Sequence, residues 1–303
     1  MGDLFGLFTN NLLPVFLAAG AGFVLGKVMK LEPQALARVA FYIFSPCLVF
    51  DLLTSNALDN GEILRMAGYA FVQMTLVTLL AGAVGWLLRF ERRLLVAVML
   101  AAMMPNAGNY GLSVNLFAFG EAGLAYASLY FITSAIMANT VGVYLASLGR
   151  SGYREALLGL FKIPTIYAVI LALVFIWLGW SLPTPLARPV EIFSNAAIPT
   201  MLILLGLQLG HAEWNGKIMG LVTAGGLKLI ISPLIGLGLS AWFGMTGPMR
   251  QAGVLEAAMP TAVMATVLAT EFEIEPAFIT ATVFLSTLLS PLTLTPLLAF
   301  LGS

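Results

Sequence analysis

The chain has 303 residues, of which 60% are hydrophobic and only 9% are charged, and its mean hydropathy is +0.98. Soluble domains carry about 25% charged residues, so water cannot be the main solvent of this protein. The 14 basic and 14 acidic residues cancel, which leaves no basic excess for nucleic acid. Cys47 is the only cysteine and His211 the only histidine, so neither an internal disulfide nor a thiolate metal site is expected.

Apolar stretches of membrane-spanning length recur along the whole chain. About 20 apolar residues cross a bilayer as a helix, and a helix satisfies its own backbone groups where lipid offers no partners. The pattern predicts an all-α integral membrane protein. Ten spans are predicted, at 11–29, 35–53, 64–88, 94–119, 122–148, 163–181, 188–210, 217–243, 249–270 and 276–301.

Lysine and arginine residues gather in alternate loops. One side holds Lys27, Lys30, Arg38, Arg89, Arg92, Arg93, Arg150, Arg154, Lys162 and Lys217, and the other side only Arg65, Arg188 and Arg250. The positive-inside rule makes the first side cytoplasmic. We therefore predict a multi-pass protein of the cytoplasmic (inner) membrane with both termini outside. Glu271, Glu273 and Glu275 are interpreted as a solvated cytoplasmic turn.

The two halves of the chain resemble each other at an offset of about 154 residues. Pro105 in span four matches Pro260 in span nine within the similar runs Ala-Ala-Met-Met-Pro and Glu-Ala-Ala-Met-Pro, and Pro46 matches Pro199 approximately. Five spans per repeat is an odd number, so the second copy must enter the membrane from the opposite side. Inverted repeats of this kind are typical of carriers with a site near the midplane.

Pro105 and Pro260 are predicted to open spans four and nine. A proline inside a helix removes one backbone donor and clashes with the preceding turn. Asn106 would lie roughly 18 Å into the bilayer at 1.5 Å per residue, a little past half of a ~30 Å core. Matching interruptions in both halves indicate where a carrier binds its substrate.

The residues that follow Pro105 are unusually polar for this depth. Asn106, Gly108, Asn109 and Tyr110 belong to the run Pro-Asn-Ala-Gly-Asn-Tyr-Gly-Leu. Glycines permit an unwound backbone, freed amides carry positive potential, and asparagine side chains can donate to a carboxylate. A substrate-binding role is favoured for the two asparagines over a role in helix packing. For Gly111 the two interpretations stay equal.

The matching wall in span nine is less polar. Pro260, Thr261, Val263 and Met264 are its candidate substrate-binding residues, and Met264 stands where span four has Asn109. One polar and one apolar wall would suit an anion with an apolar body, although Met264 could equally fill space.

Three motifs resemble the auxin efflux carrier family, which includes the plant PIN-FORMED proteins and bacterial malate or malonate permeases. They are Asn-Ala-Gly-Asn-Tyr-Gly-Leu at 106–112, Val-Ala-Phe-Tyr-Ile-Phe-Ser-Pro-Cys-Leu-Val-Phe at 39–50 and Ala-Met-Pro-Thr-Ala-Val at 258–263. The resemblance implies a homodimer with crossing broken helices and an elevator-type mechanism. It implies a scaffold of residues 1–62 and 163–216, a transport unit of residues 63–162 and 217–303, and carboxylates as substrates.

Ionisable residues inside the spans are the remaining candidates. Lys228 is predicted near the middle of span eight, where a charge needs a protein or water partner. Glu256 and Asp51 are its candidate partners, and Gln73 is a further polar candidate. A structural ion pair and a role in coupling to H⁺ or Na⁺ remain equal alternatives.

Several classes of function fit a polar midplane. A secondary active or facilitative carrier for small organic anions explains the repeat and the paired breaks together. A sodium-coupled symporter related in fold to bile-acid transporters, or an anion channel, is the alternative; a channel would need rings of charges or carbonyls that the sequence does not show. No enzyme and no cofactor is expected, because no catalytic set of residues is found at matching depth.

The predicted orientation can be tested at Ser151. A cysteine introduced there should react with a membrane-impermeant reagent only from the cytoplasmic side, because the basic loops are held inside. Labelling would be measured in intact cells and in inverted vesicles. Labelling from outside intact cells would reverse the sidedness of every site.

Overall fold

The structure is a computed structural model that describes residues 4–55, 58–147, 163–210 and 217–302. All named elements in these ranges are helices, as the sequence predicted. Ser151, His211 and the basic residues Arg150, Arg154 and Lys162 lie outside the described residues.

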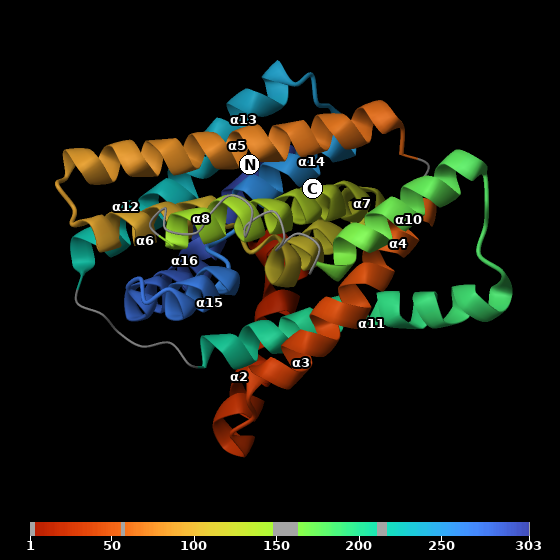
Figure 1. Ribbon diagram of the computed structural model, residues 1–303, viewed down its shortest axis with the longest axis horizontal. Helices are drawn as coiled ribbons and strands as arrows, with labels where there is room; N and C mark the ends of the chain where they lie inside the picture. The colour runs from red at the N-terminus through yellow and green to blue at the C-terminus, as the bar shows by residue number, and fades with distance from the viewer. Residues whose placement is uncertain (1–3, 56–57, 148–162, 211–216, 303) are drawn as a thin grey trace.

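The helices follow one another along the chain with short connections (Figure 1). The first half contains α1 (Leu4–Leu7), the π-helix η1 (Phe8–Leu12), α2 (Leu13–Met29), α3 (Pro33–Val39), η2 (Ala40–Phe44), α4 (Ser45–Ser55), α5 (Asn60–Leu87), α6 (Arg92–Met103), η3 (Ala107–Leu112), α7 (Ser113–Met137), η4 (Ala138–Gly142) and α8 (Val143–Ala146). The second half contains α10 (Pro164–Leu178), α11 (Thr184–Leu209), α12 (Ile218–Gly226), η5 (Leu227–Ile231), α13 (Ser232–Trp242), α14 (Gly247–Ala257), α15 (Val263–Glu271) and α16 (Pro276–Leu301).

Local sequence explains where several helices begin. Pro33, Pro164 and Pro276 occupy the first position of α3, α10 and α16, where a missing N–H costs nothing. Helix α5 begins with a capping box: Asp59 accepts from the Gly61 N–H at 3.0 Å, and the Glu62 carboxylate accepts from the Asp59 N–H at 3.3 Å.

Seven helical stretches of the described chain are long and apolar enough to cross a membrane. They are 4–29, 33–55, 61–87, 107–146, 184–209, 218–242 and 276–301. The stretch 107–146 contains a sharp turn at Gly120, whose φ of 65° and ψ of −162° are not helical. A positive φ is readily adopted by glycine, and the turn falls where the sequence predicted a boundary between two spans.

Helices α2 and α11 form the most extensive contact between two helices (Figure 1). Their backbones touch at two glycines, because a Cβ at Gly22 would overlap the Ile203 carbonyl oxygen and a Cβ at Gly206 would overlap the Ala19 carbonyl oxygen. Small residues are the usual means of close helix approach in membranes. This contact and those of α4 with α10 and α11 hold one group of helices together.

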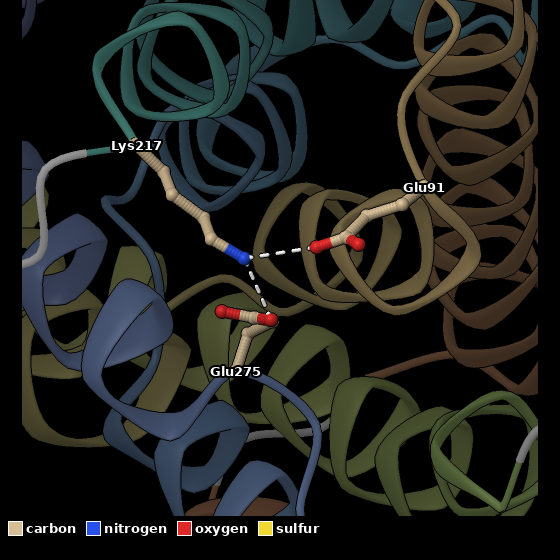
Figure 2. Close-up of polar contacts among 3 residues, drawn as sticks. All are labelled: Glu91, Lys217 and Glu275. Carbon is tan, nitrogen blue, oxygen red and sulfur yellow. Dashed lines mark hydrogen bonds and ion pairs between the residues drawn. The ribbon is translucent and has the colours of Figure 1, made fainter.

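Three helix starts meet at an ion cluster on the other group of helices. Figure 2 shows Lys217, just before α12, between Glu91, just before α6, and Glu275, just before α16. The Lys217 Nζ lies 3.1 Å from Glu91 Oε1 and 2.7 Å from Glu275 Oε1. Partial burial lowers the pKa of Lys217, but the two carboxylates raise it more, so its pKa lies above the ordinary value. Glu275 was predicted to be solvated, yet its side chain is only 16% exposed, because Lys217 covers it.

The close contact of α2 with α11 predicts a difference between two glycines of the same helix. Gly22→Ala should destabilise the protein by about 1–3 kcal/mol, because the new methyl group overlaps backbone that cannot move aside cheaply. Gly20→Ala is the matched control, since a Cβ there meets nothing within 4 Å. Thermal unfolding in detergent would compare them, and equal melting temperatures would contradict the predicted overlap.

Candidate functional site

Two interrupted helices meet at the centre of the site. Helix α6 ends at Met103 and α14 ends at Ala257, and each is followed by a short extended segment that contains Pro105 or Pro260. The two segments run antiparallel and form an isolated β-bridge between Pro105 and Thr261. The Asn106 N–H donates to the Pro260 carbonyl at 2.7 Å, and the Ala262 N–H donates to the Met104 carbonyl at 2.8 Å. Each break therefore satisfies backbone groups that the other exposes.

Thr261 fastens this crossing to the surrounding helices. Its hydroxyl donates to the Ala101 carbonyl at 2.9 Å, and its N–H donates to Ser286 Oγ at 3.1 Å. The side chain is fully buried. Thr261 and Pro260 do not line the cavity described below, and Thr261 holds the crossing in place.

A cavity of about 370 Å³ lies against one side of the crossing. One wall comes from the segment 37–45 of α3, η2 and α4, from the start of α10 and from α11. The opposite wall comes from the two breaks, η3, α7, η4 and α15. Much of the lining is apolar or aromatic, with Phe41, Phe131, Met201, Leu204 and Val267 among its residues. Apolar walls with a few polar groups are typical of small-molecule sites.

The structure brings most of the predicted substrate-binding residues to this cavity. Its lining includes Pro105, Asn106, Gly108, Asn109, Val263 and Met264. Tyr110 belongs to the same motif but does not line the cavity; its side chain is buried and its hydroxyl lies 3.0 Å from Ser290 Oγ. The polar wall of span four and the apolar wall of span nine thus face one space.

Two amide side chains supply hydrogen-bond donors at the cavity. Asn106 is 3% exposed, and its Nδ2 is buried without a hydrogen-bond partner. Asn109 Nδ2 donates to Gln208 Oε1 of α11 at 3.3 Å, which joins the two walls. The starts of η3 and α15 also border the cavity, and the first amides of a helix carry positive potential.

The sequence did not single out three polar residues of the lining. Arg38, Asn139 and Gln208 all contribute to the cavity, and Arg38 is the one charged side chain among the lining residues that the structure describes. Arg38 had counted only toward membrane orientation. The segments η2, η3 and η4 all contribute residues to the lining, and π-helical turns are frequent at functional sites, but no sequence pattern marked them.

The predicted charged and polar candidates lie away from this lining. Lys228 is 1% exposed and Glu256 is fully buried, yet among the described residues only Lys217 forms ion pairs within 4.0 Å. Gln73 joins three helices, because it donates to Ser232 Oγ at 2.8 Å and accepts from the Tyr130 hydroxyl at 2.7 Å. Asp51 accepts from the Ser55 hydroxyl at 3.4 Å on its own helix.

Apolar helices of spanning length, broken helices that meet at a buried crossing and an enclosed cavity beside it define a multi-pass membrane transporter. The comparisons with known proteins agree. The family described as "Membrane transport protein" matches residues 7–156 and 149–298, so the chain belongs to this family, the auxin efflux carrier family that its motifs resemble.

Two relatives cover nearly the whole chain. One is a protein of Methanothermobacter thermautotrophicus named "uncharacterized transporter", which is 30% identical over 93% of this chain and 94% of its own length. Another is a protein of Rhizobium meliloti named "putative malonate transporter", which is 26% identical over 97% of this chain and 96% of its own length. The family and these relatives are described as transporters and not as enzymes.

The position of Thr261 predicts a structural effect. Thr261→Val keeps the shape of the side chain but leaves the buried Ala101 carbonyl without this donor, so it should destabilise the protein by about 1–3 kcal/mol. Thr270→Val is the control, because Thr270 is exposed and bonds only within its own helix. Thermal unfolding of the two variants would be compared with wild type, and an unchanged Thr261→Val variant would show that the bond contributes little.

Proposed function

We propose that this protein is a secondary carrier of small organic anions, built from ten spans in two inverted five-helix halves. The observation that carries the proposal is the cavity at the crossing of the two broken helices. Its donors converge from segments far apart in the sequence, at η3, α11 and α15. Paired breaks in inverted halves are how many carriers form a site near the membrane midplane.

The chemistry of the cavity favours a carboxylate. The unpartnered Nδ2 of Asn106 and the amide of Asn109 supply donors, while the starts of η3 and α15 supply positive potential. The lining offers no carboxylate among its described residues, so no fixed negative charge opposes an anion. The apolar lining would contact the rest of the substrate.

Arg38 extends the same argument to the substrate class. Its side chain is exposed and borders the cavity, where a guanidinium can hold a second carboxylate in a bidentate pair. The name of the Rhizobium meliloti relative supports malonate, a short dicarboxylate, as the first compound to test. Because Arg38 belongs to the side predicted to be cytoplasmic, we assign this cavity to a cytoplasm-facing state.

The two walls suggest how the carrier moves. One wall comes from the predicted scaffold, residues 1–62 and 163–216, and the other comes from the predicted transport unit, residues 63–162 and 217–303. In an elevator movement, the crossing and its substrate would shift against α11, and the bond between Asn109 and Gln208 would break. The scaffold would form the homodimer in the cytoplasmic membrane, with both termini outside.

The amides give the sharpest test. Asn109→Ala should weaken malonate binding by about tenfold to 150-fold, because a hydrogen bond to a charged group contributes roughly 1.5–3 kcal/mol. Pro105→Ala should also weaken binding, since it could reseal the helix and withdraw backbone amides from the anion. Binding would be measured calorimetrically on purified protein, and exchange would be measured in liposomes with labelled malonate.

Two controls separate binding from packing. Gln208→Leu removes the protein partner of Asn109 but leaves its amide in place, so binding should fall much less than in Asn109→Ala. Thr270→Val controls for expression and folding. Wild-type affinity in both Asn109→Ala and Pro105→Ala would show that the crossing amides only pack, and currents without saturation would indicate a channel.

A further inference from the structure

A buried carboxyl group lies behind the crossing, away from the cavity lining. Glu256 stands near the end of α14, four residues before Pro260, and is 0% exposed. Its Oε1 accepts from Asn115 Nδ2 of α7 at 2.9 Å. The carboxylate also packs directly against the backbone of η3, because a Cβ at Gly111 would overlap it. Glu256 therefore joins the first part of one broken helix to the second part of the other.

The hydrogen bonding of this pair is incomplete. Asn115 uses its Nδ2 twice, toward Glu256 Oε1 and toward the Gly111 carbonyl, each at 2.9 Å. Asn115 Oδ1 and Glu256 Oε2 are both buried and have no hydrogen-bond partner. An ionised carboxylate and an amide oxygen are both acceptors, so neither can satisfy the other. Leaving buried polar atoms unpaired is costly.

We propose that Glu256 is a proton-binding site of the carrier. A proton taken from water binds Glu256 Oε2 and turns it into an O–H donor, and Asn115 Oδ1 accepts from it. The carboxyl and the amide then form a cyclic pair with two hydrogen bonds, in which every exchangeable hydrogen has an acceptor. Release returns the proton to water and restores the carboxylate.

The surrounding charges are consistent with one proton at a time. Lys228 of η5 interacts electrostatically with Glu256, and Tyr130 of α7 faces it, with Tyr69 of α5 beyond. Tyr110 of η3 is engaged by Ser290, and the sequences of α13 and α16 contain no titratable side chain. Lys228 supplies the positive charge that makes the ionised state tolerable, and proton binding at Glu256 leaves one net positive charge in the cluster.

That charge has a consequence for transport. The clamp of Glu256 on Asn115 and Gly111 holds the two broken helices together on the side opposite the anion cavity. A proton bound here and a monovalent anion bound in the cavity would make the moving unit electrically balanced. The proton is therefore expected to travel with the anion; this last step rests on the proposed function, whereas the proton site itself does not.

The proton site can be observed directly by infrared spectroscopy during a pH titration of the purified protein without substrate. Wild type should show a buried carboxylic acid C=O band that disappears as the pH rises and is absent in Glu256→Gln. Glu256→Gln should fold normally, because the glutamine amide can donate to Asn115 Oδ1 as the protonated acid does. Asn115→Leu should move the band to higher frequency, since the acid carbonyl loses its donor. Glu121→Gln, an exposed glutamate on α7, should leave the band unchanged.

Three results would overturn the proposal: no pH-dependent band in wild type, the same band in Glu256→Gln, or loss of the band on adding sodium chloride but not choline chloride at constant pH, which would indicate a sodium site. In liposomes, an inward proton gradient should drive malonate uptake in wild type and not in Glu256→Gln. Retained gradient-driven uptake in Glu256→Gln would exclude coupling at this carboxyl. If no variant binds malonate at all, the proposed function fails while the infrared result still stands.

Discussion

The structure depends on the exchange of backbone hydrogen bonds between two broken helices. A helix opened inside a membrane leaves donors and acceptors that lipid cannot satisfy. Here the open segments run antiparallel, so Asn106 and Ala262 donate across the crossing to Pro260 and Met104. Because each break supplies partners for the other, neither segment could remain open without the second. The crossing thus places two helix starts deep inside the protein, and the cavity lies where those starts converge.

Other prolines show that the residue alone does not open a helix. Pro189 and Pro199 lie inside α11, and Pro291 and Pro296 lie inside α16, yet both helices continue through them. Pro105 and Pro260 differ because each faces another open segment that binds the freed backbone groups. Glycine assists on the downstream side, where a Cβ at Gly108 would come within 2.8 Å of the Phe131 ring and a Cβ at Gly111 would overlap Glu256.

The crossing separates two polar sites of opposite character. On one side, neutral amides and helix starts border a cavity with apolar walls, which is suited to an anion. On the other side, Glu256 is packed without a cavity against Asn115 and Gly111, which leaves room for a proton. The same short segment, residues 105–115, contributes to both. A change in the position of η3 and α7 relative to α14 would therefore alter both sites together.

The sequence alone determined the membrane class, the helical character and the segment that borders the cavity. Composition and apolar spacing decide the first two, because they follow from transfer to lipid residue by residue. The polar run after Pro105 indicated Asn106 and Asn109 through its depth, and the family motifs were confirmed. The sequence could not place Tyr110 and Thr261 off the cavity, since their partners Ser290 and Ala101 are far away in the chain. Only the tertiary structure brought Arg38 and Gln208 to the cavity and Asn115 to Glu256, because these contacts depend on how separate helices pack, which local patterns do not encode.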